Sequence, residues 1–207
     1  MFEGGKWWLL FIVFYGIQLV LAFFGVIDAP LIDLSFVFFV MLLFFYLSLK
    51  FKFGKLVPIG MGFGALLHII GLYKVIPYGS YYGGLYGWAG LGYHYDWIVH
   101  GSAIFFLSLA ACSIFYPYLK KGLESKMLIF VVMLFFMLGL GAFNEMMEYV
   151  GYDVLGHGEG FLEFGEGDSS PVGGPWENAS MDLLFNLAGG VVGIGGFLLV
   201  KKKKELS

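Results

Sequence analysis

Six long apolar stretches run through this 207-residue chain, and each is long enough to cross a membrane as a helix. About 20 apolar residues in a helix span the roughly 30 Å hydrocarbon core of a bilayer. With 59% hydrophobic and 13% charged residues, the composition is not that of a soluble domain. The sequence therefore predicts one all-α integral membrane domain over residues 1–207, a polytopic protein with six transmembrane helices. The stretches lie at about residues 7–27, 31–49, 56–76, 95–118, 127–149 and 180–200.

The lysines predict how the chain is oriented. They lie before the first stretch, between the second and third, between the fourth and fifth, and after the sixth; Lys74 alone breaks the pattern. The remaining loops carry carboxylates instead. Lysine-rich loops usually stay on the cytoplasmic side, so we expect a multi-pass protein of the cell membrane with both termini in the cytoplasm. The lysines of these groups are Lys6, Lys50, Lys52, Lys55, Lys120, Lys121, Lys126 and residues 201–204.

Ionisable residues near the outer ends of four stretches are the main functional signal. Such groups are costly inside a membrane, so they usually face a protein interior and mark a working site. Several share a helical face, because they are three or four residues apart. We expect them to converge in one outward-facing pocket. These residues are His68, Asp96, His100, Glu145, Glu148 and Asp182, with Asn186 one turn beyond Asp182.

Each of these residues also has a plainer interpretation. Asp96 and Asp182 begin their stretches, where an Asp commonly caps a helix. His68 or His100 alone would more often be a hydrogen-bonded core histidine. Glu145 and Glu148 differ, because the helix dipole disfavours negative charge at the end of a helix. Two carboxylates there need protons, a cation or a nearby histidine.

Taken together, the histidines and carboxylates predict a site for a divalent metal such as Zn²⁺, Mn²⁺ or Fe. The expected ligands are His68, His100, Glu145 and Glu148, and the expected catalytic groups are Glu145, Glu148, Asp182 and Asp96. No strict spacing such as His-Glu-x-x-His occurs. The single cysteine, Cys112, lies within a span, which excludes an intramolecular disulfide and a thiolate site.

Two outer loops and several small or aromatic residues complete the pattern. The loops at residues 77–92 and 151–179 are rich in Gly, and Phe161 and Trp176 indicate that the second folds back as a lid. The glycines between residues 189 and 196 favour close helix packing. Aromatic residues at span ends are expected to be interfacial anchors. They include Trp7, Trp8, Trp97, Tyr116 and Tyr118.

The order of these motifs resembles a known family. The matching residues are His68-Ile-Ile-Gly71-Leu-Tyr73, Pro77, Tyr95-Asp96 with His100, Glu145-x-x-Glu148, Gly167-Asp168, Trp176-Glu177, and Asp182 with Gly189. Over about residues 65–195 the chain resembles the YjdF-like family of uncharacterised prokaryotic inner-membrane proteins. The pattern is also similar to that of the wider VanZ-like group, which is associated with glycopeptide resistance. The resemblance implies a fold and a site, with no established reaction.

Three hypotheses for function follow from the sequence. The leading one is a metal-dependent enzyme that acts on a lipid or lipid-linked headgroup at the outer leaflet. The alternatives are a proton-coupled transporter or permease, and a non-catalytic membrane module whose polar cluster locks the helices together. Membrane lipids are the expected partners, and nothing supports a nucleic-acid partner. The sequence predicts no particular oligomeric state.

The predicted orientation can be tested by cysteine labelling. In Ser169→Cys, a membrane-impermeant maleimide added to intact cells is expected to label the new cysteine, because the loop at residues 151–179 is predicted to lie outside. The wild-type chain, whose Cys112 lies within a span, is the control. Protection of the new cysteine in intact cells, with labelling only after lysis, would overturn the orientation.

Overall fold

The structure is a computed structural model that describes residues 5–27, 31–51, 53–73, 95–150 and 174–206. Within these ranges the secondary structure is helical and contains no strand, which confirms the predicted all-α class. The helices are α1 (Gly5–Phe23), α2 (Leu31–Phe51), α3 (Leu56–Leu72), α5 (Tyr95–Gly122), α6 (Lys126–Tyr149) and α7 (Gly174–Leu206).

Five of the described helices are long and apolar enough to cross a membrane, namely α1, α2, α5, α6 and α7. Helix α3, with 17 residues, is a shorter apolar helix. At 1.5 Å per residue it is about 26 Å long. The last residues of the predicted third span, 74–76, lie outside the described residues. The multi-pass architecture is thus confirmed, with five to six apolar helices.

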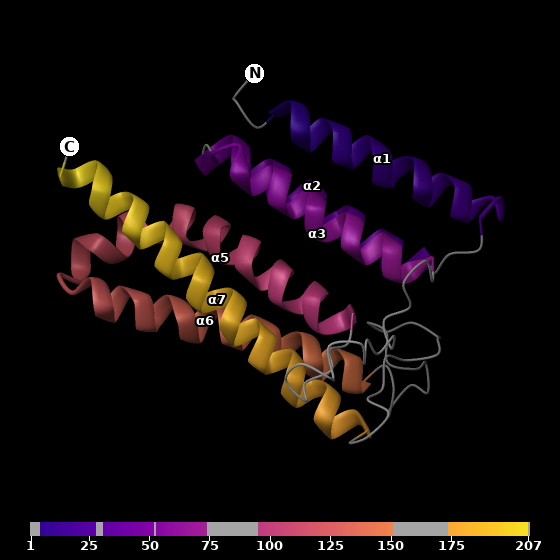
Figure 1. The fold of residues 1–207 in the computed structure, drawn as a ribbon. Helices are drawn as coiled ribbons and strands as arrows, with labels where there is room; N and C mark the ends of the chain where they lie inside the picture. Colours follow the sequence, from indigo (N-terminus) through magenta and orange to yellow (C-terminus); the bar gives the residue numbers. More distant parts are fainter. Residues whose placement is uncertain (1–4, 28–30, 52, 74–94, 151–173, 207) are drawn as a thin grey trace, which may run out of the picture.

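The helices run alternately up and down a single bundle (Figure 1). Both termini lie at one end of the bundle, together with the connections from α2 to α3 and from α5 to α6. Lys120, Lys126 and Lys201 belong to helix ends on this side. The start of α5, the end of α6 and the start of α7 meet at the opposite end, which is where the ionisable residues of the predicted pocket lie.

Two groups of buried apolar residues hold the bundle together. One is formed by α1, α2 and α3 and includes Ala110 of α5; the other is formed by α5, α6 and α7. Tyrosine hydroxyls add bonds between helices: Tyr15 donates to the Ala65 carbonyl at 2.5 Å, and Tyr95 donates to the Leu67 carbonyl at 2.7 Å. Helix α5 therefore joins the two halves, because it packs against α3 on one side and α7 on the other.

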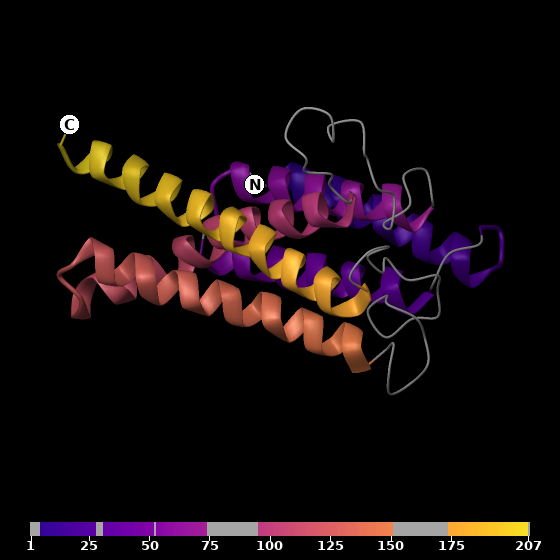
Figure 2. The same cartoon turned by 60° about the horizontal axis from the view of Figure 1, so that its bottom comes forward.

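The most extensive helix packing is between α5 and α7. Figure 2 shows α7 lying between α5 and α6. A Cβ atom at Gly189 would collide with the Gly101 carbonyl oxygen, and one at Gly193 would lie 2.7 Å from the Phe105 carbonyl oxygen. The predicted role of the glycines in close packing therefore holds for these two positions. It does not hold for Gly196, where a Cβ would meet nothing within 4 Å.

The predicted outer loop, residues 151–179, extends too far along the chain, because its last residues belong to a helix. Helix α7 begins at Gly174, so Pro175 and the residues up to Ala179 are helical. A proline in the first turn and an acid such as Glu177 both favour a helix start, and this signal outweighs the glycine-rich composition nearby. Trp176 is 83% exposed, so it does not fold back as expected. Phe161 and the rest of the proposed lid lie outside the described residues.

Trp97 also departs from the prediction that it is an interfacial anchor. It is 5% exposed and stacks on Phe185 of α7, with ring centroids 5.4 Å apart. The cause is the close approach of α5 and α7, which encloses the side of α5 that carries Trp97. This stack fixes the two helices to each other at the level of the polar residues.

Gly189→Ala is expected to destabilise the protein by about 1–3 kcal/mol, because the added methyl group meets backbone atoms of Gly101 that cannot move without separating two helices. The matched control is Gly196→Ala on the same helix, where the methyl group has open space. Melting curves of both variants in one detergent measure the difference. Equal melting temperatures would show that the contact between α5 and α7 is not tight.

Candidate functional site

Three helices contribute the ionisable residues at the end of the bundle away from the lysines. Asp96 and His100 lie in the first two turns of α5, and Glu145 and Glu148 lie in the last two turns of α6. Asp182 lies about two turns into α7. Because α5 and α7 begin where α6 ends, the alternating direction of the chain brings these positions to one level (Figure 1).

His100 is at the centre of the cluster. Its Nε2 atom lies 3.4 Å from Asp96 Oδ1 and 3.9 Å from Glu148 Oε1. Its Nδ1 atom lies 3.5 Å from Glu145 Oε1. Both ring nitrogens therefore face carboxylates, and these carboxylates belong to two different helices.

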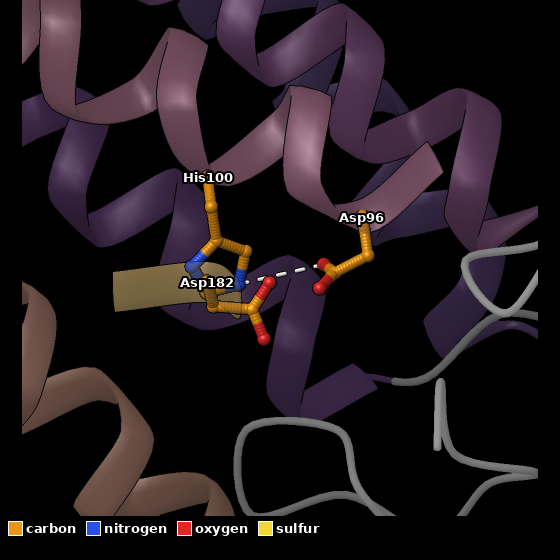
Figure 3. A group of neighbouring side chains, drawn as sticks. All are labelled: Asp96, His100 and Asp182. Carbon is orange, nitrogen blue, oxygen red and sulfur yellow. Dashed lines mark ion pairs between the residues drawn. The ribbon is translucent and has the colours of Figure 1, made fainter. Parts of the chain in front are cut away.

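Asp182 is the most deeply buried acid of the cluster. Its exposed fraction is 0%, and neither carboxylate oxygen has a hydrogen-bond partner within the described residues. In Figure 3 the carboxylate of Asp182 lies beside the His100 ring and points towards Asp96. An ionised carboxylate without donors is costly to bury. This position therefore requires a proton or a bound cation.

Two groups of side chains have the spacing of metal ligands. One potential ligand atom from each of Asp96, His100 and Asp182 lies within 4.8 Å of the others, and the same is true of His100, Glu145 and Glu148. Imidazole nitrogen combined with carboxylate oxygen suits Zn²⁺, Mn²⁺ or Fe. The geometry thus brings together five of the six predicted site residues around one histidine.

His68 is the predicted ligand that neither group contains. It lies on α3, whose described packing is against α1, α2 and α5, whereas the cluster is built by α5, α6 and α7. Its role as a ligand stays a prediction. His94 and His157 lie outside the described residues.

Two asparagines belong to the site, although neither was among its predicted catalytic or ligand residues. The Asn144 side-chain amide donates to Glu148 Oε1 at 2.6 Å. Asn186 is 1% exposed, and its Nδ2 atom lies 3.5 Å from His100 Nδ1. Both have a signal in the sequence, because each is four residues from a carboxylate on the same helix.

Gly141 provides the room that Asn186 occupies. A Cβ atom at Gly141 would lie 2.7 Å from Asn186 Nδ2 and 3.2 Å from Asn186 Cγ. The neighbouring Gly139 on the same helix has nothing within 4 Å of such an atom. The absence of a side chain at Gly141 therefore lets the Asn186 amide reach the His100 ring.

No described lysine of these three helices is near the cluster. Lys120, Lys126 and Lys201 lie at the opposite ends of α5, α6 and α7, which is roughly 30 Å away at 1.5 Å per residue. These lysines therefore cannot neutralise the buried carboxylates. Within the described part of these three helices, His100 is the basic group that lies beside the carboxylates.

The fold and the site together define a multi-pass membrane protein with a buried histidine and carboxylate centre near one end of its bundle. The chain belongs to the family described as "Predicted membrane protein (DUF2238)", whose model matches residues 7–203. Comparisons with curated proteins and with solved structures found no match.

Gly141→Ala is expected to displace the Asn186 amide from His100 without unfolding the protein, because the clashing Nδ2 atom is the far end of a flexible side chain. The measurement is imidazole ¹⁵N NMR of histidine-labelled protein, with His100→Ala to assign the signal. The His100 resonances should shift in Gly141→Ala and stay unchanged in Gly139→Ala. An unchanged His100 signal in both variants would show that Asn186 does not influence the ring.

Proposed function

We propose that this protein is a metal-dependent membrane hydrolase that acts on the phosphoryl or ester group of a lipid or lipid-linked headgroup. The observation that carries the proposal is the buried Asp182 carboxylate, which has no described hydrogen-bond partner. One of its oxygens lies within 4.8 Å of a potential ligand atom of Asp96 and of His100. A divalent cation at this position would satisfy oxygens that otherwise need protons.

The residues present fit such a cation. Asp96, Asp182 and His100 offer two carboxylates and one imidazole, which is a common ligand set for Zn²⁺, Mn²⁺ and Fe. Glu145 Oε1, which lies 3.5 Å from His100 Nδ1, is placed to accept the Nδ1 proton and orient the ring, as hydrogen-bond partners of metal-bound histidines usually do. When bound, the cation would supply charge that polarises a substrate oxygen and acidifies a water molecule.

The depth of the cluster and the exposed apolar surface of α6 beside it support a lipid-type substrate. His100 is five residues from the start of α5, which is about 8 Å along the helix. This depth is close to the headgroup layer. Phe143, Met146 and Tyr149 expose more than half of their surface on the helix that carries Glu145 and Glu148. A lipid packed against the exposed side of α6 would therefore be separated from the cluster only by the width of this helix.

The reaction is a hydrolysis in which this chain's carboxylates handle the proton. The oxygen of a water molecule bonds to the phosphorus or carbonyl carbon of the substrate. The bond to the leaving oxygen then breaks, and its electron pair stays on that oxygen. Glu145 or Glu148 accepts a proton from the water and passes it to the leaving oxygen.

The orientation and location are part of the same proposal. With the lysine-bearing ends in the cytoplasm, the cluster would open towards the outer leaflet of the cell membrane. We also propose, from the order of the motifs between residues 65 and 195, that the chain is YjdF-like with the wider VanZ-like pattern. We likewise propose that residues 1–207 act as a single membrane domain.

The transporter alternative has less support. Between the cluster and the opposite helix ends, α5, α6 and α7 carry no Asp, Glu, His or Lys over residues 101–119, 127–144 and 183–200. A proton relay across the membrane would need such groups along its path. The structural-module alternative is decided by the following experiment.

Purified wild-type protein is expected to contain a divalent metal in a fixed ratio to the chain. In proteoliposomes it should release phosphate or a carboxylic acid from lipids. Asp182→Asn should weaken metal binding by at least about 10-fold and abolish hydrolysis, because it removes a ligand charge. Elemental analysis and product release measure the two effects. Glu124→Gln, at an exposed acid in the connection between α5 and α6, is the control.

The contrary outcome is equally clear. Wild-type protein that is pure and metal-free, and whose melting temperature is unchanged by added Zn²⁺ or Mn²⁺, would contradict the proposed function. The cluster would then act only by holding the helices together.

A further inference from the structure

We propose that Glu148 is the proton acceptor of the hydrolysis and that Asn144 positions it, whereas Glu145 holds the His100 ring. This inference rests on the proposed function, which leaves open which of the two glutamates takes the proton. Both glutamates lie on α6, three residues apart, so they belong to one face of the helix. Their partners differ, and this difference assigns their roles.

Glu145 is engaged with the histidine. Its Oε1 atom lies 3.5 Å from His100 Nδ1, and its side chain is 9% exposed. The other ring nitrogen, Nε2, lies 3.4 Å from Asp96 Oδ1 and is the one that faces the proposed ligand set (Figure 3). A neutral imidazole that binds a metal keeps its proton on the other nitrogen, which is here Nδ1. Glu145 therefore accepts this proton, and a further proton from water would cancel the charge that fixes the ring.

Glu148 faces the ring nitrogen that is left for the cation. Its Oε1 atom lies 3.9 Å from His100 Nε2, and its side chain is 17% exposed, compared with 9% for Glu145. A general base has to come within hydrogen-bond reach of the water whose proton it takes. Of the two glutamates, Glu148 is thus the one beside the metal-binding nitrogen, and it is also the more open to water.

Asn144 holds the Glu148 carboxylate in this place. The Asn144 Nδ2 atom donates to Glu148 Oε1 at 2.6 Å, and the two residues are one turn apart on α6. The bond occupies Oε1, so Oε2 is the oxygen that takes the proton. Because an amide does not ionise, Asn144 keeps its hydrogen bond while the charge of the carboxylate changes. Asn144 acts through Glu148 and is therefore a positioning residue.

The proton follows a closed path in this assignment. Glu148 Oε2 takes a proton from water, and the water oxygen bonds to the phosphorus or carbonyl carbon of the substrate. The bond to the leaving oxygen breaks, and its electron pair stays on that oxygen. The leaving oxygen then takes the proton from Glu148, which becomes a carboxylate again. Glu145 stays at His100 Nδ1 throughout.

The experiment compares Glu148→Gln with Glu145→Gln in full-length protein. Hydrolysis is measured on phosphatidylglycerol vesicles, because this lipid contains both a phosphodiester and carboxylic esters. Mn²⁺ affinity is measured from the electron paramagnetic resonance signal of free Mn²⁺. Glu148→Gln should lower kcat by about 10²–10⁴-fold with unchanged Mn²⁺ affinity. Glu145→Gln should weaken Mn²⁺ binding by about 10–100-fold, because it removes the charge that orients the ring. Glu124→Gln is the control for both.

A double variant separates positioning from a merely structural role of Asn144. Asn144→Leu removes the donor at similar volume and should lower kcat by about 10–100-fold with unchanged KM and Mn²⁺ affinity. Combined with Glu148→Gln, it should cause no further loss of kcat, because its effect passes through the Glu148 carboxylate. Met146→Leu, at an exposed position of the same helix, is the control.

The outcomes distinguish this inference from the proposed function. Lost Mn²⁺ binding in Glu148→Gln would make Glu148 a ligand and overturn the assignment, as would a kcat equal to that of the wild type. Further loss of kcat in the double variant would overturn the role of Asn144. A wild type that binds Mn²⁺ and hydrolyses nothing would overturn the hydrolase and the assignment together. If Glu148→Gln fails to fold, Asn144→Leu decides, because an unchanged kcat in that variant overturns the inference.

Discussion

The close contact between α7 and α5 is the constraint on which the polar centre depends. Gly189 lies against the carbonyl of Gly101, and Gly101 directly follows His100. Asn186 is one turn before Gly189, and Asp182 is one turn before Asn186. The glycine contact therefore sets how near these α7 side chains come to the His100 ring. A side chain at Gly189 would hold the two helices apart and would move the Asp182 carboxylate away from the His100 ring.

The level of the site could be predicted from the sequence because depth in a membrane is a one-dimensional quantity. The position of Asp96 or Glu148 within its apolar stretch gives its distance from the end of a helix. The alternation of helix direction then places both at the same end of the bundle. For this reason the all-α class, the apolar spans and the grouping of five site residues were predicted.

What could not be predicted depends on rotation about the helix axes and on which helices are neighbours. His68 has a suitable depth and lies on α3, which packs mainly against α5 and the first two helices, so its part in the site stays a prediction. Trp97 was expected at the lipid surface, and its burial depends on the position of Phe185. The start of α7 at Gly174 depends on local helix-start preferences, which the composition of the loop concealed.

The shallow position of the centre has an electrical consequence. In the proposed orientation, a cation that enters from the outer surface travels about 8 Å of the roughly 30 Å that separate the two sides. It therefore crosses about a quarter of the membrane voltage. One elementary charge gains about 2.3 kcal/mol per 100 mV across the whole membrane. At 100 mV the divalent ion of the proposed site would thus gain about 1 kcal/mol on arrival, and an energised membrane would strengthen its occupancy severalfold.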